Sequence, residues 1–179
     1  MQDVAAELQR LAQSDQISLQ SLLEHEEFID VLIEATQIVL RTSVTEKKAA
    51  LKNAVINSAL PNPPEASLQN IYLRFVDDLT SWHLRVLSLF HDPRQWFMDH
   101  GRKSPEFTMT SSLGALLEKA FPELAGRREF YDFISKDLYL KGLLSTDGLH
   151  TMMTASGTYE SRSTDLGKGL IRFISISDL

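Results

Sequence analysis

The segment from 67 to 91 constrains the fold more than any other part of the sequence. When its residues are placed about 100° apart, as in an α-helix, apolar side chains cover well over half of the circumference. A helix with so wide an apolar arc must pack on at least two neighbours. We therefore expect one long central helix here, with other helices around it.

Shorter helical patterns surround this segment. The spacing of apolar residues predicts helices over 4–12 and 17–41. Ser43-Val44-Thr45-Glu46 has the spacing of a capping box, which predicts a further helix that ends before the prolines at 61–64. Pro93, after Asp92, is acceptable as the first residue of a short new helix.

The last third of the chain has the pattern of a smaller α+β module. Ser111 or Ser112 is expected to cap one helix, and a second helix is expected over 127–141. Residues 149–154 and 158–162 have the composition of two weak strands of a β-hairpin. On the helix over 127–141, we expect a buried side formed by Phe130, Phe133, Ile134, Leu138 and Leu140. Its exposed sector is expected to hold Arg128, Glu129, Asp132, Ser135, Lys136 and Tyr139.

Two short runs carry a resemblance to the end of a winged-helix domain: KDLYLKGLL at 136–144 and STDLGKGLIRFI at 163–174. Gly142 stands where a helix ends in a left-handed residue, and Thr164 and Gly167 match a Thr-x-x-Gly turn that opens the last element. The resemblance covers roughly 111–174. It implies a module that contacts DNA or protein, although 121–126 is too short for the usual separate second helix.

The front half resembles a set of uncharacterised bacterial helical proteins, some of them linked to abortive phage infection. The run EKKAALKNA at 46–54 and the sequence His91-Asp92-Pro93 carry this likeness. Together the patterns predict a mostly α fold: a helical bundle over 1–107, and a winged-helix-like α+β module with a small β-hairpin over 108–179, packed on the bundle.

Composition narrows the function classes. The net charge is −6, and residues 1–60 hold five Lys and Arg against nine Asp and Glu, so this part of the chain would repel a phosphate backbone. Cys is absent, which excludes disulfides, thiolate metal sites and a cysteine nucleophile. No secretory leader pattern and no membrane-span pattern stands out, so we expect a soluble, cytoplasmic protein.

The sequence gives no positive sign of catalysis, of a cofactor or of a small-molecule ligand. His83 and His91 lack a recognisable ligand partner, and an apolar surround favours a core histidine at 83. The favoured hypothesis is therefore a non-enzymatic protein-interaction or regulatory protein that binds a protein partner or associates with itself. The resemblance of the front half implies a role in bacterial phage defence. The alternative is a DNA-binding transcriptional regulator.

Contact residues for either function are predicted on the terminal module. Acids alternate with bases on the helix over 127–141, which favours a salt-bridged or protein-contacting face over DNA. Trp96 and Phe97 are candidate interface aromatics, the alternative being that they complete the core. The candidate contacts for nucleic acid or a partner are Arg128, Lys136, Tyr139, Lys141, Arg162 and Lys168.

Overall fold

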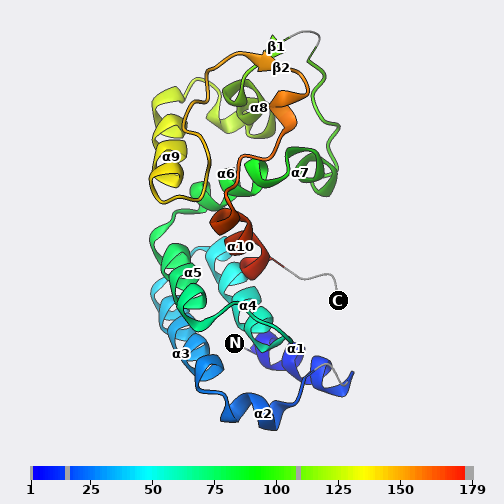
Figure 1. Cartoon of the computed structure of the whole chain (residues 1–179), viewed down its shortest axis with the longest axis vertical. Helices are drawn as coiled ribbons and strands as arrows, with labels where there is room; N and C mark the ends of the chain where they lie inside the picture. Colours follow the sequence, from blue (N-terminus) through cyan, green and yellow to red (C-terminus); the bar gives the residue numbers. More distant parts are fainter. Residues whose placement is uncertain (1, 15–16, 108–109, 176–179) are drawn as a thin grey trace. The chain divides into compact units, whose positions relative to one another are not determined.

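The computed structural model describes residues 2–14, 17–107 and 110–175. These residues are mostly helical, with one small antiparallel sheet of two strands (Figure 1). The chain divides into two compact units, one of residues 1–81 with 172–179 and the other of residues 82–171. The predicted domain boundary between 107 and 108 is not tested by this division into compact units, and it stays a prediction. Residues 108–109 lie outside the described part of the chain.

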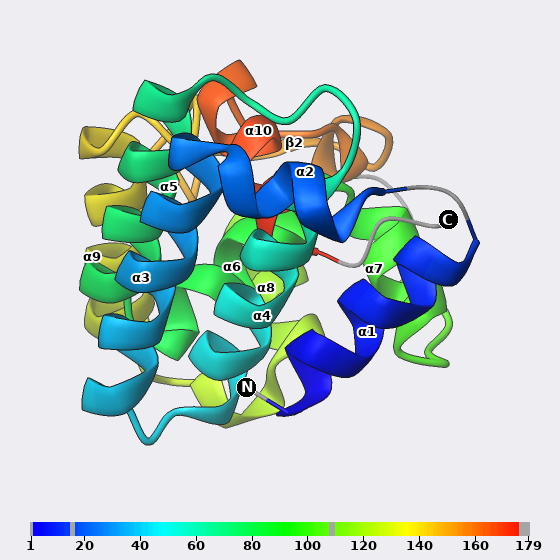
Figure 2. The ribbon, with the colours of Figure 1, turned by 90° about the horizontal axis from the view of Figure 1, so that it is seen from below.

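The first unit is a helical bundle. Helices α3, α4 and α5 pack on one another, and α1 packs on α4, which therefore lies between α1 and α3 (Figure 2). Phe28, Val31 and Ile38 of α3 are buried in its core, as are Leu51 and Val55 of α4. The helices of this unit are α1 (Gln2–Gln13), α2 (Leu19–Glu24), α3 (Glu26–Arg41), α4 (Thr45–Ala59) and α5 (Ala66–Asp78).

Two predicted helix starts are corrected here. The helix expected over 17–41 is interrupted at His25, which has an extended backbone between α2 and α3. The capping box predicted at Ser43–Glu46 is wrong, because α4 begins at Thr45 with Val44 at its N-cap and no side-chain capping bond. The hydroxyl of Thr42 instead accepts from the N–H of Val44 at 3.2 Å, and this bond shapes the turn before the helix.

The long central helix predicted over 67–91 is two helices, α5 and α6 (Ser81–His91). At Leu79 the backbone turns to an extended conformation with ψ 141°, while its side chain stays buried at 1% exposure. Asp77 and Asp78 end α5, where the helix dipole disfavours carboxylates, and Thr80 occupies the N-cap position that favours threonine. The apolar pattern continues through the break because Leu79 remains in the core.

The end of α10 (Asp165–Ile174) belongs to the first unit and is held by two amides of α4. The last carbonyls of a helix have no partner within it. Asn57 is buried at 8% exposure, and its Nδ2 lies 2.8–3.1 Å from the carbonyl oxygens of Arg172, Phe173 and Ser175. Asn53 donates to the carbonyl of Ile174 at 2.9 Å.

The second unit is built from short elements. Its strands pair antiparallel, with Thr110 opposite Thr154 and Ser111 opposite Met153. Asp92 caps α7 by accepting from the N–H of Gln95. Ser112, one of the two predicted caps, accepts from the N–H of Ala115 at the start of α8. The elements after α6 are α7 (Pro93–Asp99), β1 (Thr110–Ser111), α8 (Leu113–Ala120), η1 (Pro122–Leu124), α9 (Arg128–Leu140), β2 (Met153–Thr154), η2 (Gly157–Tyr159) and the start of α10.

The hairpin predicted from 149–154 and 158–162 is therefore wrong. Residues 153–154 pair with β1, from more than forty positions earlier, and 157–159 form a 3₁₀ helix. Arg162 explains why the returning chain does not join β2. Its N–H donates to the carbonyl of Phe90 at 2.8 Å, and its own carbonyl accepts from the N–H of Ser145 at 2.7 Å.

The start of α10 is fastened to the turn after α9. Gly142 is left-handed with φ +72°, as its position predicted. The hydroxyl of Thr164 donates to the carbonyl of Gly142 at 2.6 Å and accepts from the N–H of Gly167 at 3.0 Å. A Cβ on Gly167 would lie 2.2 Å from the carbonyl oxygen of Leu143.

Replacing Asn57 tests the capping of α10. We expect N57A to lower the free energy of unfolding by about 3 kcal/mol, because three carbonyls at the end of α10 lose their donor, the buried one of Phe173 among them. The control N53A removes a single bond from a half-buried site and should cost about 1 kcal/mol. Urea denaturation followed by circular dichroism measures both, and equal losses would contradict the role given to Asn57.

Replacing Gly167 tests the close contact with Leu143. In an open helix, Gly to Ala stabilises by up to about 1 kcal/mol. Here we expect G167A to destabilise by about 3 kcal/mol, because the added methyl group forces the two backbones apart. Thermal unfolding gives the sign directly, and a stabilised variant would show that the contact is not as close as described.

Candidate functional site

Helix α9 presents two large apolar side chains to solvent. Phe133 is 64% exposed and Leu140 is 71% exposed. They are seven residues apart and so share one side of the helix. The prediction that both lie on the buried side is wrong, and so is the exposed position expected for Ser135, which has no exposed surface.

The buried side of α9 is formed instead by Tyr131, Ile134, Ser135 and Leu138. At 100° per residue these four side chains lie on the opposite side of the helix from Phe133 and Leu140. A small buried Ser135 allows α9 to approach its neighbours closely. The unit thus buries a serine and a tyrosine while it leaves a phenylalanine and a leucine at the surface.

Tyr131 is held by a specific partner. Its hydroxyl donates to Glu118 Oε1 of α8 at 3.0 Å, and the residue is 4% exposed. Burial, followed by the hydrogen bond and charge of Glu118, raises the pKa of Tyr131 to about 12. This contact fixes the rotation of α9 and with it the side on which Phe133 projects.

Polar residues border the exposed apolar pair. Tyr139 is 44% exposed, and Lys136 is exposed one helical turn before Leu140. The ring of Phe133 also meets the buried ring of His83 edge to face, with centroids 6.5 Å apart. We call the exposed residues Phe133, Lys136, Tyr139 and Leu140 the α9 face.

The predicted cationic contacts are mostly paired with carboxylates. Arg128 Nε lies 3.4 Å from Asp132, and Lys141 Nζ lies 2.9 Å from Asp137. Lys168 Nζ lies 3.2 Å from Asp165. These pairs leave little unbalanced positive charge for phosphates along the helix.

Arg162 is a structural residue of the second unit rather than a surface cation. It is half-buried, and its Nη2 donates to the carbonyl of Gly157 at 2.7 Å. Its guanidinium also lies 3.6 Å from the carboxylate of Glu160. Among the lysines and arginines of the predicted set, Lys136 is the one that forms no ion pair within the described residues.

Trp96 and Phe97 lie in the core of the second unit. They are 6% and 2% exposed. Trp96 stacks on His100 with ring centroids 3.9 Å apart and meets Phe121 edge to face at 5.0 Å. This burial agrees with the alternative in which the two aromatics complete the core.

Two histidines make contacts that the sequence does not reveal. His83 is 4% exposed, and its Nε2 lies 3.2 Å from Asp137 Oδ2, whose other oxygen meets Lys141. His91 Nδ1 lies 3.0 Å from the hydroxyl of Ser163. In each pair the histidine could serve as a general base. His83 and Ser163 are almost wholly buried, however, which limits the access of a substrate to either pair.

Among the described residues, no group of three or more His, Cys, Asp or Glu is placed to hold a metal ion. None of their helices combines the length and apolar character needed to cross a bilayer.

Comparison with known proteins returns no family: the chain matches no family model, no curated protein and no solved structure.

Replacing Tyr131 tests what fixes the rotation of α9. At pH 8 we expect Y131F to be less stable by about 1 kcal/mol, because it loses the bond to Glu118. A tyrosine whose pKa rises from 10.0 to about 12 on folding contributes stability below pH 10 and loses it as the pH rises through 12. This rise in pKa corresponds to about 2.7 kcal/mol, so the stability difference between the two proteins should shrink and then change sign across this range.

Denaturant unfolding at a series of pH values measures this difference. Y139F is the matched control, since Tyr139 is on the same helix but exposed. A difference that stays constant from pH 8 to pH 12 would contradict the raised pKa.

Proposed function

We propose that the chain is a non-enzymatic protein-interaction or regulatory protein that binds its partner through the α9 face. The observation that carries the proposal is the exposure of Phe133 and Leu140 on one side of α9. The resemblance of the front half to proteins of abortive infection suggests phage defence as the setting.

The choice of buried face supports an interaction. Full burial of a Phe or Leu side chain is worth about 1.5–3 kcal/mol. The unit forgoes much of this gain at two positions of one helix, while Ser135 is buried with a hydroxyl that has no partner in the described residues. A partner that covers Phe133 and Leu140 recovers that free energy on binding.

The charges favour a protein partner over a nucleic acid. A DNA-reading helix needs cations and amides that are free to meet phosphates and bases. Arg128 and Lys141 already face carboxylates of α9 itself, at Asp132 and Asp137. An apolar centre with a polar border is instead typical of a protein interface.

Site-directed crosslinking tests the proposal in living bacteria. A photoreactive benzoylphenylalanine at position 140 should give a defined crosslinked species, either with a second copy of the chain or with another protein. The same group at Met152, which is 63% exposed in the same unit, is the control and should give none. Equal labelling from both positions would contradict a specific α9 face.

Substitution tests the energetic role of the same residues. We expect the double variant F133S/L140S to weaken the association found by crosslinking at least about tenfold, since two apolar contacts are lost. M152S should leave it unchanged. Sedimentation velocity measures the strength of self-association, and calorimetry measures the affinity for a second protein.

The alternative function has its own readout. Duplex DNA that shifts in a gel at low salt, and no longer shifts with K136E, would favour DNA binding by α9. Together with loss of the position-140 crosslink, that result would overturn the protein-interface proposal.

A further inference from the structure

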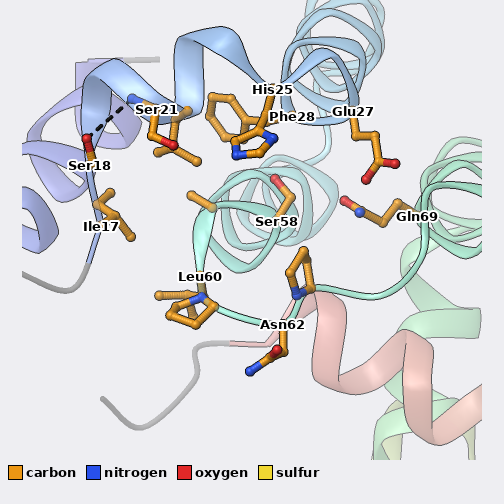
Figure 3. A pocket seen from close by; sticks show the side chains of 14 residues that line it. Ile17, Ser18, Ser21, His25, Glu27, Phe28, Ser58, Leu60, Asn62 and Gln69 are labelled. Atoms are coloured by element: carbon orange, nitrogen blue, oxygen red, sulfur yellow. Dashed lines mark hydrogen bonds between the residues drawn. The ribbon is translucent and has the colours of Figure 1, made fainter.

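The first unit contains a cavity of about 350 Å³ formed by segments that are distant in the sequence. Its walls come from α2 and the start of α3, the end of α4 with the following turn, and α5 (Figure 3). The volume lies at the lower end of the range for small-molecule sites.

Gln69 of α5 lines this cavity and carries an acceptor that has no partner in the described residues. The residue is 2% exposed, and its Nε2 donates to the carbonyl of Pro64 at 2.7 Å. That bond fixes which end of the amide is nitrogen, so Oε1 is the atom left without a partner in the described residues. A buried polar atom in this state costs about 1–3 kcal/mol, which a ligand with a suitable donor would offset.

Further hydrogen-bond acceptors surround the same space. The hydroxyl of Ser58 donates to the carbonyl of Val55 at 2.8 Å, so its lone pairs remain for a donor from the cavity. Figure 3 shows the Gln69 amide reaching from α5 toward Ser58, with the Glu27 carboxylate on the same side of the view. His25 adds a ring nitrogen that can accept when the imidazole is neutral. Such a set favours a ligand that brings N–H donors.

The charges around the cavity indicate the sign of the charge on its ligand. Residues 11–40 hold six Asp and Glu and no Lys or Arg. The described residues that line the cavity include Glu27 but no Lys or Arg. This local excess of carboxylates attracts a cation.

Apolar surface supplies the rest of the wall. Leu22 and Phe28 line one part, and Pro61 and Pro63 line another. We infer that the cavity binds a small organic cation, whose ammonium or guanidinium group meets Gln69 and Glu27 and whose apolar part lies on Phe28 and the prolines. This site is in the first unit and does not depend on the α9 face, so either proposal can fail without the other.

Calorimetry with phenethylammonium chloride on the full chain tests the inference. We expect saturable binding, and at least about tenfold weaker binding of the neutral analogue phenethyl alcohol, because it lacks the charge-assisted bonds. Absence of saturable binding, or equal affinity for the two compounds, would overturn the assignment.

Two glutamates next to each other provide matched variants. E27Q should weaken phenethylammonium binding by about three- to tenfold, because it removes the carboxylate that lines the cavity. Glu26 and Glu27 are both exposed, but Glu26 is not among the lining residues. E26Q should therefore change affinity by less than about twofold, because its carboxylate does not contact the ligand and its longer-range effect is screened by salt. Equal losses would show a general charge effect and overturn the site.

A second measurement needs no change at Gln69, whose bond to Pro64 also stabilises the turn. In nuclear magnetic resonance spectra of the wild-type protein, the side-chain amide signals of Gln69 should shift on addition of phenethylammonium. Those of Asn53, whose amide caps α10, should stay in place. Unmoved Gln69 signals at saturation would overturn the contact with this residue.

Discussion

The second unit depends on the contact between the turn at Gly142–Leu143 and the start of α10. Gly142 can take its left-handed conformation without strain, and its carbonyl then accepts from the hydroxyl of Thr164. Gly167 allows the helix to approach the carbonyl of Leu143 more closely than any other residue would. The same hydroxyl caps the first turn of α10, so one threonine joins two elements more than twenty residues apart.

This contact decides where α9 ends, and Tyr131 decides how it is rotated. Leu138, Leu143 and Leu144 stay in the core on either side of the turn. With both constraints in place, Leu140 in the last turn of α9 projects outward. The exposure of Phe133 and Leu140 is thus the consequence of contacts elsewhere in the unit, rather than of a loosely held helix.

Part of the local capping chemistry could be predicted from the sequence, while the choice among apolar faces could not. Ser112 and Gly142 act on backbone groups two or three residues away and stand where predicted, whereas the capping box expected at Ser43–Glu46 does not form. On α9, by contrast, large apolar and aromatic side chains span about half of the circumference, with Phe133 toward one edge and Tyr131 at the other, and periodicity cannot tell that Tyr131 is buried and Phe133 exposed. That choice requires Glu118, on another helix.

Pairings between distant segments were missed for the same reason. Strand β2 has β1 as its partner, and nothing near 153–154 in the sequence indicates this. The cavity is assembled from α2, α3, α4 and α5, so its residues form no motif. The break at Leu79 was missed because a buried leucine continues the helical pattern through a residue with an extended backbone.

Two buried amides in the first unit show how structural and ligand-binding roles differ. Asn57 directs its donors to the last carbonyls of α10, where the fold itself needs them. Gln69 uses a donor in the same way, on the carbonyl of Pro64, but its acceptor has no partner among the described residues. An apolar side chain at 69 would avoid that cost but would also release the turn at Pro64. Fold and ligand can therefore both require glutamine here, the first for its nitrogen and the second for its oxygen.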